Sequence, residues 1–219
     1  MAKSIYVQAV DDIQTALRPF MKGCGFRVRG RTFNRITEDG LTQVVSIQMG
    51  ASDPPGTTYI PGLREKLHGL FTINLGIYVP EVARHSGSGE AKSWVQEYHC
   101  CVRARLGYAS GEERDIWWHA RFDDAVISDI RRRLELGGLP FLDRFSTRDK
   151  ILAEWHDRSK NMGGGCPPRI VMAIILAERG YSDRARELLA QQVLETRNPG
   201  HADYVQGLAN KLAVGNLDG

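Results

Sequence analysis

The chain has 219 residues, of which 42% are hydrophobic and 25% charged, and its formal net charge is +3. This length suits one ordinary domain with an appendage, or two small domains. Its longest apolar run, Ile170–Ala177, is far too short to span a membrane, and the N-terminus has no hydrophobic stretch typical of a signal peptide. We therefore expect a soluble, cytoplasmic protein without a membrane partner.

Positive charge is concentrated near the N-terminus, although the total charge indicates no class of partner. Between Asp12 and Glu38 there is no acidic residue. The six basic residues of this interval are Arg18, Lys22, Arg27, Arg29, Arg31 and Arg35. The four cysteines form no C-x-x-C motif, and two of them are adjacent, so we expect reduced thiols rather than disulfides or a metal site.

A helix is predicted between about Ile5 and Cys24. Apolar residues recur there every three or four positions, which places one apolar stripe along a helix face. They are Val10, Ile13, Leu17, Phe20, Met21 and Cys24. Gly23 and Gly25 are expected to end the helix, and Pro19 predicts a kink or an early stop, because proline removes a backbone hydrogen bond.

Strand-like runs follow this helix. The first three are Phe26–Arg29, Thr32–Thr37 and Leu41–Met49. Asp39-Gly40 between two of them is a hairpin signal. A Pro- and Gly-rich loop is expected over Ala51–Gly69, because such residues are unsuited to a strand interior.

The run from Phe71 to Val79 has an apolar residue at every odd position. This period of two predicts the central strand of one antiparallel sheet, with its odd positions in the core. The even positions, which we expect on an open polar face, are Thr72, Asn74, Gly76 and Tyr78. Later strands are predicted over Val95–Tyr108 and Ile116–Arg121.

From Phe122 onward the period becomes helical. Further helices are expected from Ser146, and over Pro168–Arg179, Ser182–Glu195 and His201–Val214. The stretch Gly180–Ala185, with later apolar residues and Pro199, is similar to the second half of a tetratricopeptide repeat. The predicted fold is α+β: an N-terminal helix packed on one antiparallel sheet of about five or six strands in residues 1–140, followed by a helical appendage in residues 141–219 that packs on the first domain.

Several short motifs occur in the order seen in a bacterial family known as domain of unknown function 4304. They are Gly25-Phe26, Gly30-Arg31-Thr32-Phe33, Gln48 at a strand end, and Phe71-Thr72-Ile73-Asn74-Leu75-Gly76. On these motifs the chain resembles that family over roughly Ala9–Trp118, and it departs from it in the Pro-rich loop and the helical tail. The resemblance implies a helix followed by antiparallel strands and no established activity. Some members lie in toxin and immunity gene settings, which favours a binding role.

The polar sheet face is the first candidate binding site. Its candidate residues are Gln48, Asn74, His99, Arg103 and Arg105. Amide side chains beside two arginines are suited to a carboxylate, a phosphate or a peptide backbone. The alternative is that the amides hold loop backbone and the arginines form solvated cross-strand ion pairs.

A basic hairpin is the second candidate. Its residues are Arg27, Arg29, Arg31 and Arg35. Interleaved Phe26 and Phe33 fit a nucleic-acid surface, on which aromatic rings stack with bases. The simpler interpretation is that both rings are core residues and that the charges protect a sheet edge from pairing with other chains.

The sequence contains no motif typical of a catalytic site. The six histidines form no i, i+4 pair, and no G-x-S-x-G or H-E-x-x-H motif occurs. His99 and Cys101 share a strand face, yet residues two apart on a strand lie about 7 Å from each other, beyond a hydrogen bond. Gly163-Gly164-Gly165 before a helix is either an anion-binding loop or a flexible linker. We predict no catalytic residue, cofactor or metal.

The sequence thus favours a non-catalytic binding protein, with an immunity-type role as one form, that recognises a macromolecular partner, in the first place a protein, through the polar sheet face. One alternative is a cryptic enzyme that uses His99 or His119 near Arg103 and Asn74. The other is nucleic-acid or anion binding through the basic hairpin.

Overall fold

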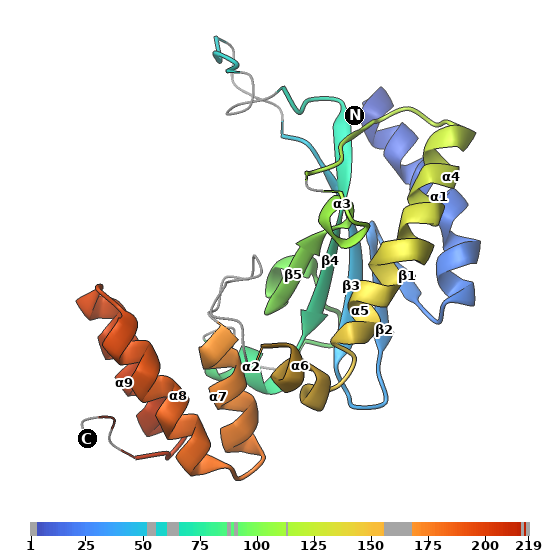
Figure 1. Ribbon diagram of the computed structural model, residues 1–219. Helices are drawn as coiled ribbons and strands as arrows, with labels where there is room; N and C mark the ends of the chain where they lie inside the picture. The colour runs from blue at the N-terminus through green and yellow to red at the C-terminus, as the bar shows by residue number, and fades with distance from the viewer. Residues whose placement is uncertain are drawn as a thin grey trace. The chain divides into compact units, whose positions relative to one another are not determined.

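The computed structural model describes residues 4–51, 56–60, 66–86, 89, 92–112, 114–155, 168–215 and 217. An N-terminal helix is followed by one antiparallel sheet of six strands and then by several helices (Figure 1). The predicted α+β fold class is therefore confirmed. None of the helices in the described ranges is long and apolar enough to cross a membrane.

Helix α1 spans Ile5–Gly23, close to the predicted bounds. Ser4 caps it by accepting a hydrogen bond from the backbone N–H of Val7. The early stop predicted at Pro19 is wrong, because the helix continues through this residue. Leu17 and Met21, on either side of the proline, are both buried, so packing holds the helix across the missing hydrogen bond.

The sheet has the strand order β1-β2-β3-β4-β5, and β6 pairs with β4. Its strands are β1 (Arg27–Arg29), β2 (Thr32–Ile36), β3 (Thr42–Met49), β4 (Leu70–Tyr78), β5 (Val102–Arg105) and β6 (Trp118–His119). Arg27 is paired with Asn34 across the β1–β2 hairpin, and Gly30 supplies the positive φ of its turn. The predicted central position of β4 is confirmed, because β4 lies between β3 and β5 and also pairs with β6.

Both faces of β4 are buried, so the open polar face predicted for this strand is wrong. Ile73 and Leu75 are fully buried as expected, but Thr72 is only 1% exposed and Asn74 only 5%. Gly76 shows how closely the even face is covered, because a methyl group on it would lie 2.6 Å from Cys100 Sγ. The alternation identified the two faces of the strand, but it carried no information about what packs on the polar one.

The region predicted as one strand over Val95–Tyr108 is broken into three elements. They are the 3-10 helix η1 (Glu97–His99), the short strand β5, and helix α3 (Leu106–Ala109). Reciprocal hydrogen bonds between Gln96 and His99 stabilise the first turn. Only four residues of this region therefore pair in the sheet, although the hydrophobic alternation extends further.

One of the remaining helices follows β4 directly, and the others lie from Asp124 onward (Figure 1). They are α2 (Pro80–His85), α4 (Asp124–Arg133), the π-helical η2 (Leu134–Gly138), α5 (Leu139–Arg144), α6 (Arg148–Trp155), α7 (Pro168–Glu178), α8 (Ser182–Glu195) and α9 (Pro199–Lys211). Helices α1 and α4 contact each other, and the bounds of α8 are those predicted.

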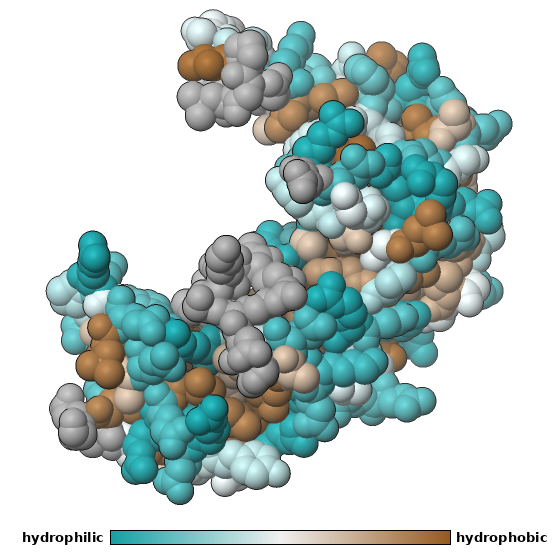
Figure 2. Space-filling model, viewed as in Figure 1, coloured by the Kyte–Doolittle hydropathy of each residue, from teal (hydrophilic) through white to brown (hydrophobic). Residues whose placement is uncertain are grey.

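Contacts within the chain form two compact units. One contains Met1–Arg35, Val44–Leu75 and Ala104–Phe141, and the other contains Ile36–Gln43, Gly76–Arg103 and Leu142–Gly219. The helical tail thus shares its unit with two earlier segments, and a domain boundary at residue 140 stays a prediction. Helix α7 is buried from Ile170 to Ile175 and contacts α2, α6 and α8. Figure 2 shows apolar residues over α7 and mostly hydrophilic ones over α8.

Candidate functional site

Three of the five candidate residues of the polar face lie together, and we name Gln48, Asn74 and Arg105 the polar cluster. The buried Asn74 of β4 donates a hydrogen bond from Nδ2 to Gln48 Oε1 over 2.7 Å. Arg105, at the end of β5, donates from Nη1 to the same oxygen over 3.4 Å. Gln48 is exposed near the end of β3, so the cluster reaches the surface.

The guanidinium of Arg105 is held loosely. Its Nε lies 3.7 Å from Asp115 Oδ2, and its central carbon lies 5.3 Å from the centre of the Trp117 ring. The ring provides a cation–π contact without using an N–H donor. Both polar contacts are longer than a strong charge-assisted hydrogen bond, so the planar fork of the half-buried Arg105 retains capacity for an anion.

Arg103 has a different environment. It pairs with the buried Glu97 through two hydrogen bonds, of 2.6 Å from Nε and 3.0 Å from Nη2. The hydrogen bond that Arg103 donates to Glu97, together with the negative charge of Glu97, outweighs partial burial and raises the pKa of Arg103. Because this bidentate pair occupies the fork, Arg103 stabilises the turn around η1, and it contributes less free donor capacity than Arg105.

His99 is also engaged locally. Its Nδ1 accepts a hydrogen bond from the backbone N–H of Gln96 over 3.1 Å, and its ring lies against that of Tyr98. Burial, and then the positive charge of Lys92, lower the pKa of His99. The imidazole is therefore neutral at neutral pH.

We expect the His99 imidazole to titrate below its ordinary pKa of 6.5, because both burial and Lys92 disfavour the charged ring. The measurement is a pH titration followed by NMR of the histidine side chains, with the signal assigned through His99→Gln. Lys92→Gln should move the midpoint upward, since it removes one of the two causes. A midpoint at or above 6.5 in the unmodified chain would contradict this environment.

The cysteines next to His99 are both buried, and they are thiols, as the sequence predicted. Cys100 Sγ donates to the backbone carbonyl of Gln96, and Cys101 Sγ to that of Ile77. Burial raises the pKa of Cys100 well above its ordinary value, and neighbouring Cys101 and Glu97 raise it further. Such a thiol is a poor nucleophile. Among the described residues, no group of three or more His, Cys, Asp or Glu side chains is suited to a metal ion.

The basic hairpin divides into two pairs of arginines. Arg31 donates to the Asp11 carboxylate and to the Val7 carbonyl of α1. Arg35 donates to the Cys24 carbonyl and lies over the Phe26 ring. Arg27 and Arg29 are exposed on β1. Since Phe26 and Phe33 are both buried in the core, the aromatic residues of the predicted nucleic-acid surface are not available for stacking.

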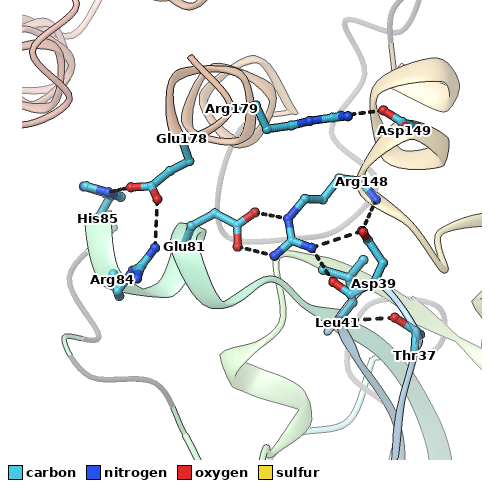
Figure 3. Close-up of polar contacts among 10 residues, drawn as sticks. All are labelled: Thr37, Asp39, Leu41, Glu81, Arg84, His85, Arg148, Asp149, Glu178 and Arg179. Atoms are coloured by element: carbon cyan, nitrogen blue, oxygen red, sulfur yellow. Dashed lines mark hydrogen bonds and ion pairs between the residues drawn. The ribbon is translucent and has the colours of Figure 1, made fainter. Parts of the chain in front are cut away.

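An ionic cluster that the sequence did not predict surrounds Arg148 at the start of α6 (Figure 3). Its Nε lies 2.5 Å from Glu81 Oε1 and its Nη2 lies 2.8 Å from Glu81 Oε2. Nη1 donates to the Asp39 carboxylate over 3.0 Å and also to the Asp39 carbonyl. Glu81, in the first turn of α2, is only 4% exposed. These contacts raise the pKa of Arg148, and the hydrogen bond that it donates to Glu81 has the largest effect.

Three further ionic contacts flank this cluster in Figure 3. Glu178 of α7 accepts from Arg84 over 2.9 Å and contacts His85 Nε2 at 2.7 Å. Arg179 pairs with Asp149.

We interpret the Arg148 cluster as structural, because Nε, Nη1 and Nη2 of Arg148 all donate to Glu81 or Asp39. It was missed because Asp39 and Arg148 are separated by 109 residues and no spacing signal connects them. The predicted Gly163–Gly165 loop lies outside the described residues.

Residues 66–144 match the family model described as domain of unknown function DUF4304. This range is well under half of the chain. It contains Asn74, Arg103 and Arg105, whereas Gln48 and the motifs between Gly25 and Phe33 lie outside it. The resemblance predicted over residues 9–118 is therefore supported from residue 66 onward, and the match extends further, into α5. No curated protein and no solved structure matches the chain.

Proposed function

We propose that this chain is a non-catalytic binding protein and that its polar cluster takes a carboxylate of a protein partner. The observation that supports this function is the guanidinium of Arg105, whose contacts with Gln48 and Asp115 are both long, at 3.4 and 3.7 Å. A planar guanidinium forms two parallel hydrogen bonds with a carboxylate, and these are stronger than either of the present contacts.

The other two members of the cluster prepare this site. Asn74 is buried and donates to Gln48 Oε1, which leaves the amide nitrogen of Gln48 as a second donor beside Arg105. A side chain that is held in place before binding loses less conformational freedom when the partner arrives. Tyr108 is exposed in α3, three residues after Arg105 in the sequence, and its ring provides apolar contact area for a partner.

The biological setting belongs to the same proposal. An immunity-type role, in which the chain blocks a harmful protein by binding it, is supported by the resemblance of the motif Phe71–Gly76 to a family with members in toxin and immunity gene settings. A bacterial, cytoplasmic location is supported by that resemblance and by the reduced thiol of Cys100.

The helical tail has a supporting role in this proposal. Helices α7 and α8 contact each other, and α8 contacts α9, in an arrangement that we propose is similar to half of a tetratricopeptide repeat. One such unit is too short for a repeat array. Because α7 is buried along most of its length, we assign the tail to stabilising its own unit rather than to binding.

Substituting Arg105 with Gln should abolish partner capture, because glutamine keeps a polar side chain but loses the charged fork. The measurement is affinity purification of the intact chain from the source cells, with mass spectrometry of the proteins that co-purify. Arg121→Gln is the matched control, since Arg121 is exposed and pairs with Asp123 alone among the described carboxylates.

A partner retained by Arg121→Gln and lost by Arg105→Gln is the expected result. The melting temperature of both variants should stay within a few degrees of the original chain. Equal capture by all three proteins, or a large loss of stability in Arg105→Gln, would contradict a binding role for the cluster.

A further inference from the structure

Strand β1 is an edge of the sheet. It stands at the end of the strand order and pairs with β2 alone. All three of its residues, Arg27, Val28 and Arg29, are exposed. In an antiparallel ladder the backbone groups of successive residues point alternately to the two neighbouring strands. The N–H and C=O groups of β1 that point away from β2 have no strand partner in the part of the chain that the structure describes.

The side chains of this edge make it strongly basic. Arg27 and Arg29 are two residues apart on one strand, so they share a face, and Val28 lies on the other. No acidic side chain within the described residues forms an ion pair with either arginine. A third arginine of the hairpin, Arg31, pairs with Asp11 of α1. The edge thus combines free backbone groups with two unneutralised charges.

We propose that the β1 edge accepts an extended acidic segment of a protein partner as an added strand. Residues two apart on the incoming strand would lie beside Arg27 and Arg29, because neighbouring strands place side chains of one face next to each other. The segment recognised therefore has acidic residues at alternate positions and an apolar residue between them beside Val28. Backbone hydrogen bonds to the sheet edge would supply affinity, and the two arginines would supply selectivity.

The observations favour an acidic peptide over nucleic acid for this surface. Single-stranded nucleic acid needs aromatic rings for base stacking, but Phe26 and Phe33 are buried. It also needs several cations, but Arg31 and Arg35 are held by Asp11 and by the Cys24 carbonyl. A second copy of the chain is disfavoured as well, because two β1 edges would bring arginines of like charge together.

The test is fluorescence anisotropy of the full chain with labelled synthetic peptides. One peptide alternates Glu and Val, a second alternates Lys and Val, and a third is the Glu–Val peptide with alternate backbone nitrogens methylated. We expect binding of the first peptide, and a loss of at least about tenfold in affinity for the second, because charge complementarity is reversed. The methylated peptide should also fail to bind, because it lacks the donors that a strand needs.

Charge reversal of the edge makes the test specific. In Arg27→Glu with Arg29→Glu, affinity for the Glu–Val peptide should fall and affinity for the Lys–Val peptide should rise. Arg121→Glu with Arg132→Glu is the control, since both residues are exposed in the same unit and lie outside the strands of the sheet. The inference does not depend on the polar cluster, because charge reversal at Arg27 and Arg29 tests the edge while Arg105 is left intact.

Three outcomes would overturn the inference. Equal binding of the methylated peptide would show plain electrostatic attraction instead of strand addition. Tighter binding of a single-stranded oligonucleotide, lost on the same charge reversal, would assign the edge to nucleic acid. No binding of the Glu–Val peptide to the original chain would remove the site.

Discussion

Replacing Arg148 with Ala is expected to lower the free energy of unfolding by about 3 to 5 kcal/mol, because it leaves a buried carboxylate without its partner. That carboxylate belongs to Glu81, which is 4% exposed and receives two hydrogen bonds from Arg148. The same change removes the donors that hold the Asp39 carboxylate and carbonyl. Urea unfolding followed by tryptophan fluorescence measures the loss.

Arg179→Ala is the matched control for Arg148→Ala. Arg179 also pairs with a carboxylate of α6, that of Asp149, but both side chains are exposed, so the expected cost is about 0 to 1 kcal/mol. A second comparison separates pairing from packing. The double variant Glu81→Leu with Arg148→Met removes both charges and should be more stable than Arg148→Ala alone. Equal stability of Arg148→Ala and Arg179→Ala would contradict the importance of the buried pair.

The Arg148 cluster also illustrates a limit of the sequence. Helix α8 was predicted with its observed bounds and α1 nearly so, because a helix is defined by side chains three and four residues apart. The pair of Arg148 with Glu81 spans 67 residues and joins the first turns of two helices. No local pattern distinguishes such an arginine from a solvated one, so only the folded chain reveals the contact.

The candidate site was predictable in part for the same reason. Alternation along β4 placed Asn74 on the polar face, and the order of the strands brought Gln48 beside it, where the two amides are hydrogen-bonded. The burial of Asn74 was not predictable, because it depends on what covers the face. Arg103 was grouped with Arg105 by spacing alone. Its partner Glu97 lies six residues away in η1, in a turn that the apparent strand pattern concealed.

Leu75→Ala is expected to cost about 2 to 5 kcal/mol of unfolding free energy, because it removes methyl groups from a fully buried site and leaves a cavity. Leu75 lies in the central strand with 0% exposure. The backbone of η2 approaches its side chain closely, since a methyl group on Gly138 would lie 3.7 Å from Leu75 Cδ1. The cavity should therefore collapse little, because β4 and the π-helical turn both hold their positions through backbone hydrogen bonds. Chemical denaturation measures the change.

Leu136→Ala is the matched control, because it deletes the same atoms from η2 at a side chain that is 71% exposed. It should change the unfolding free energy by less than about 0.5 kcal/mol. Both variants lose the same leucine atoms, so the difference between their unfolding free energies gives the contribution of burial. If Leu75→Ala were no more destabilising than Leu136→Ala, β4 would have to lie at an edge of the sheet. The polar cluster, which depends on Asn74 being fixed in that strand, would then lose its support as well.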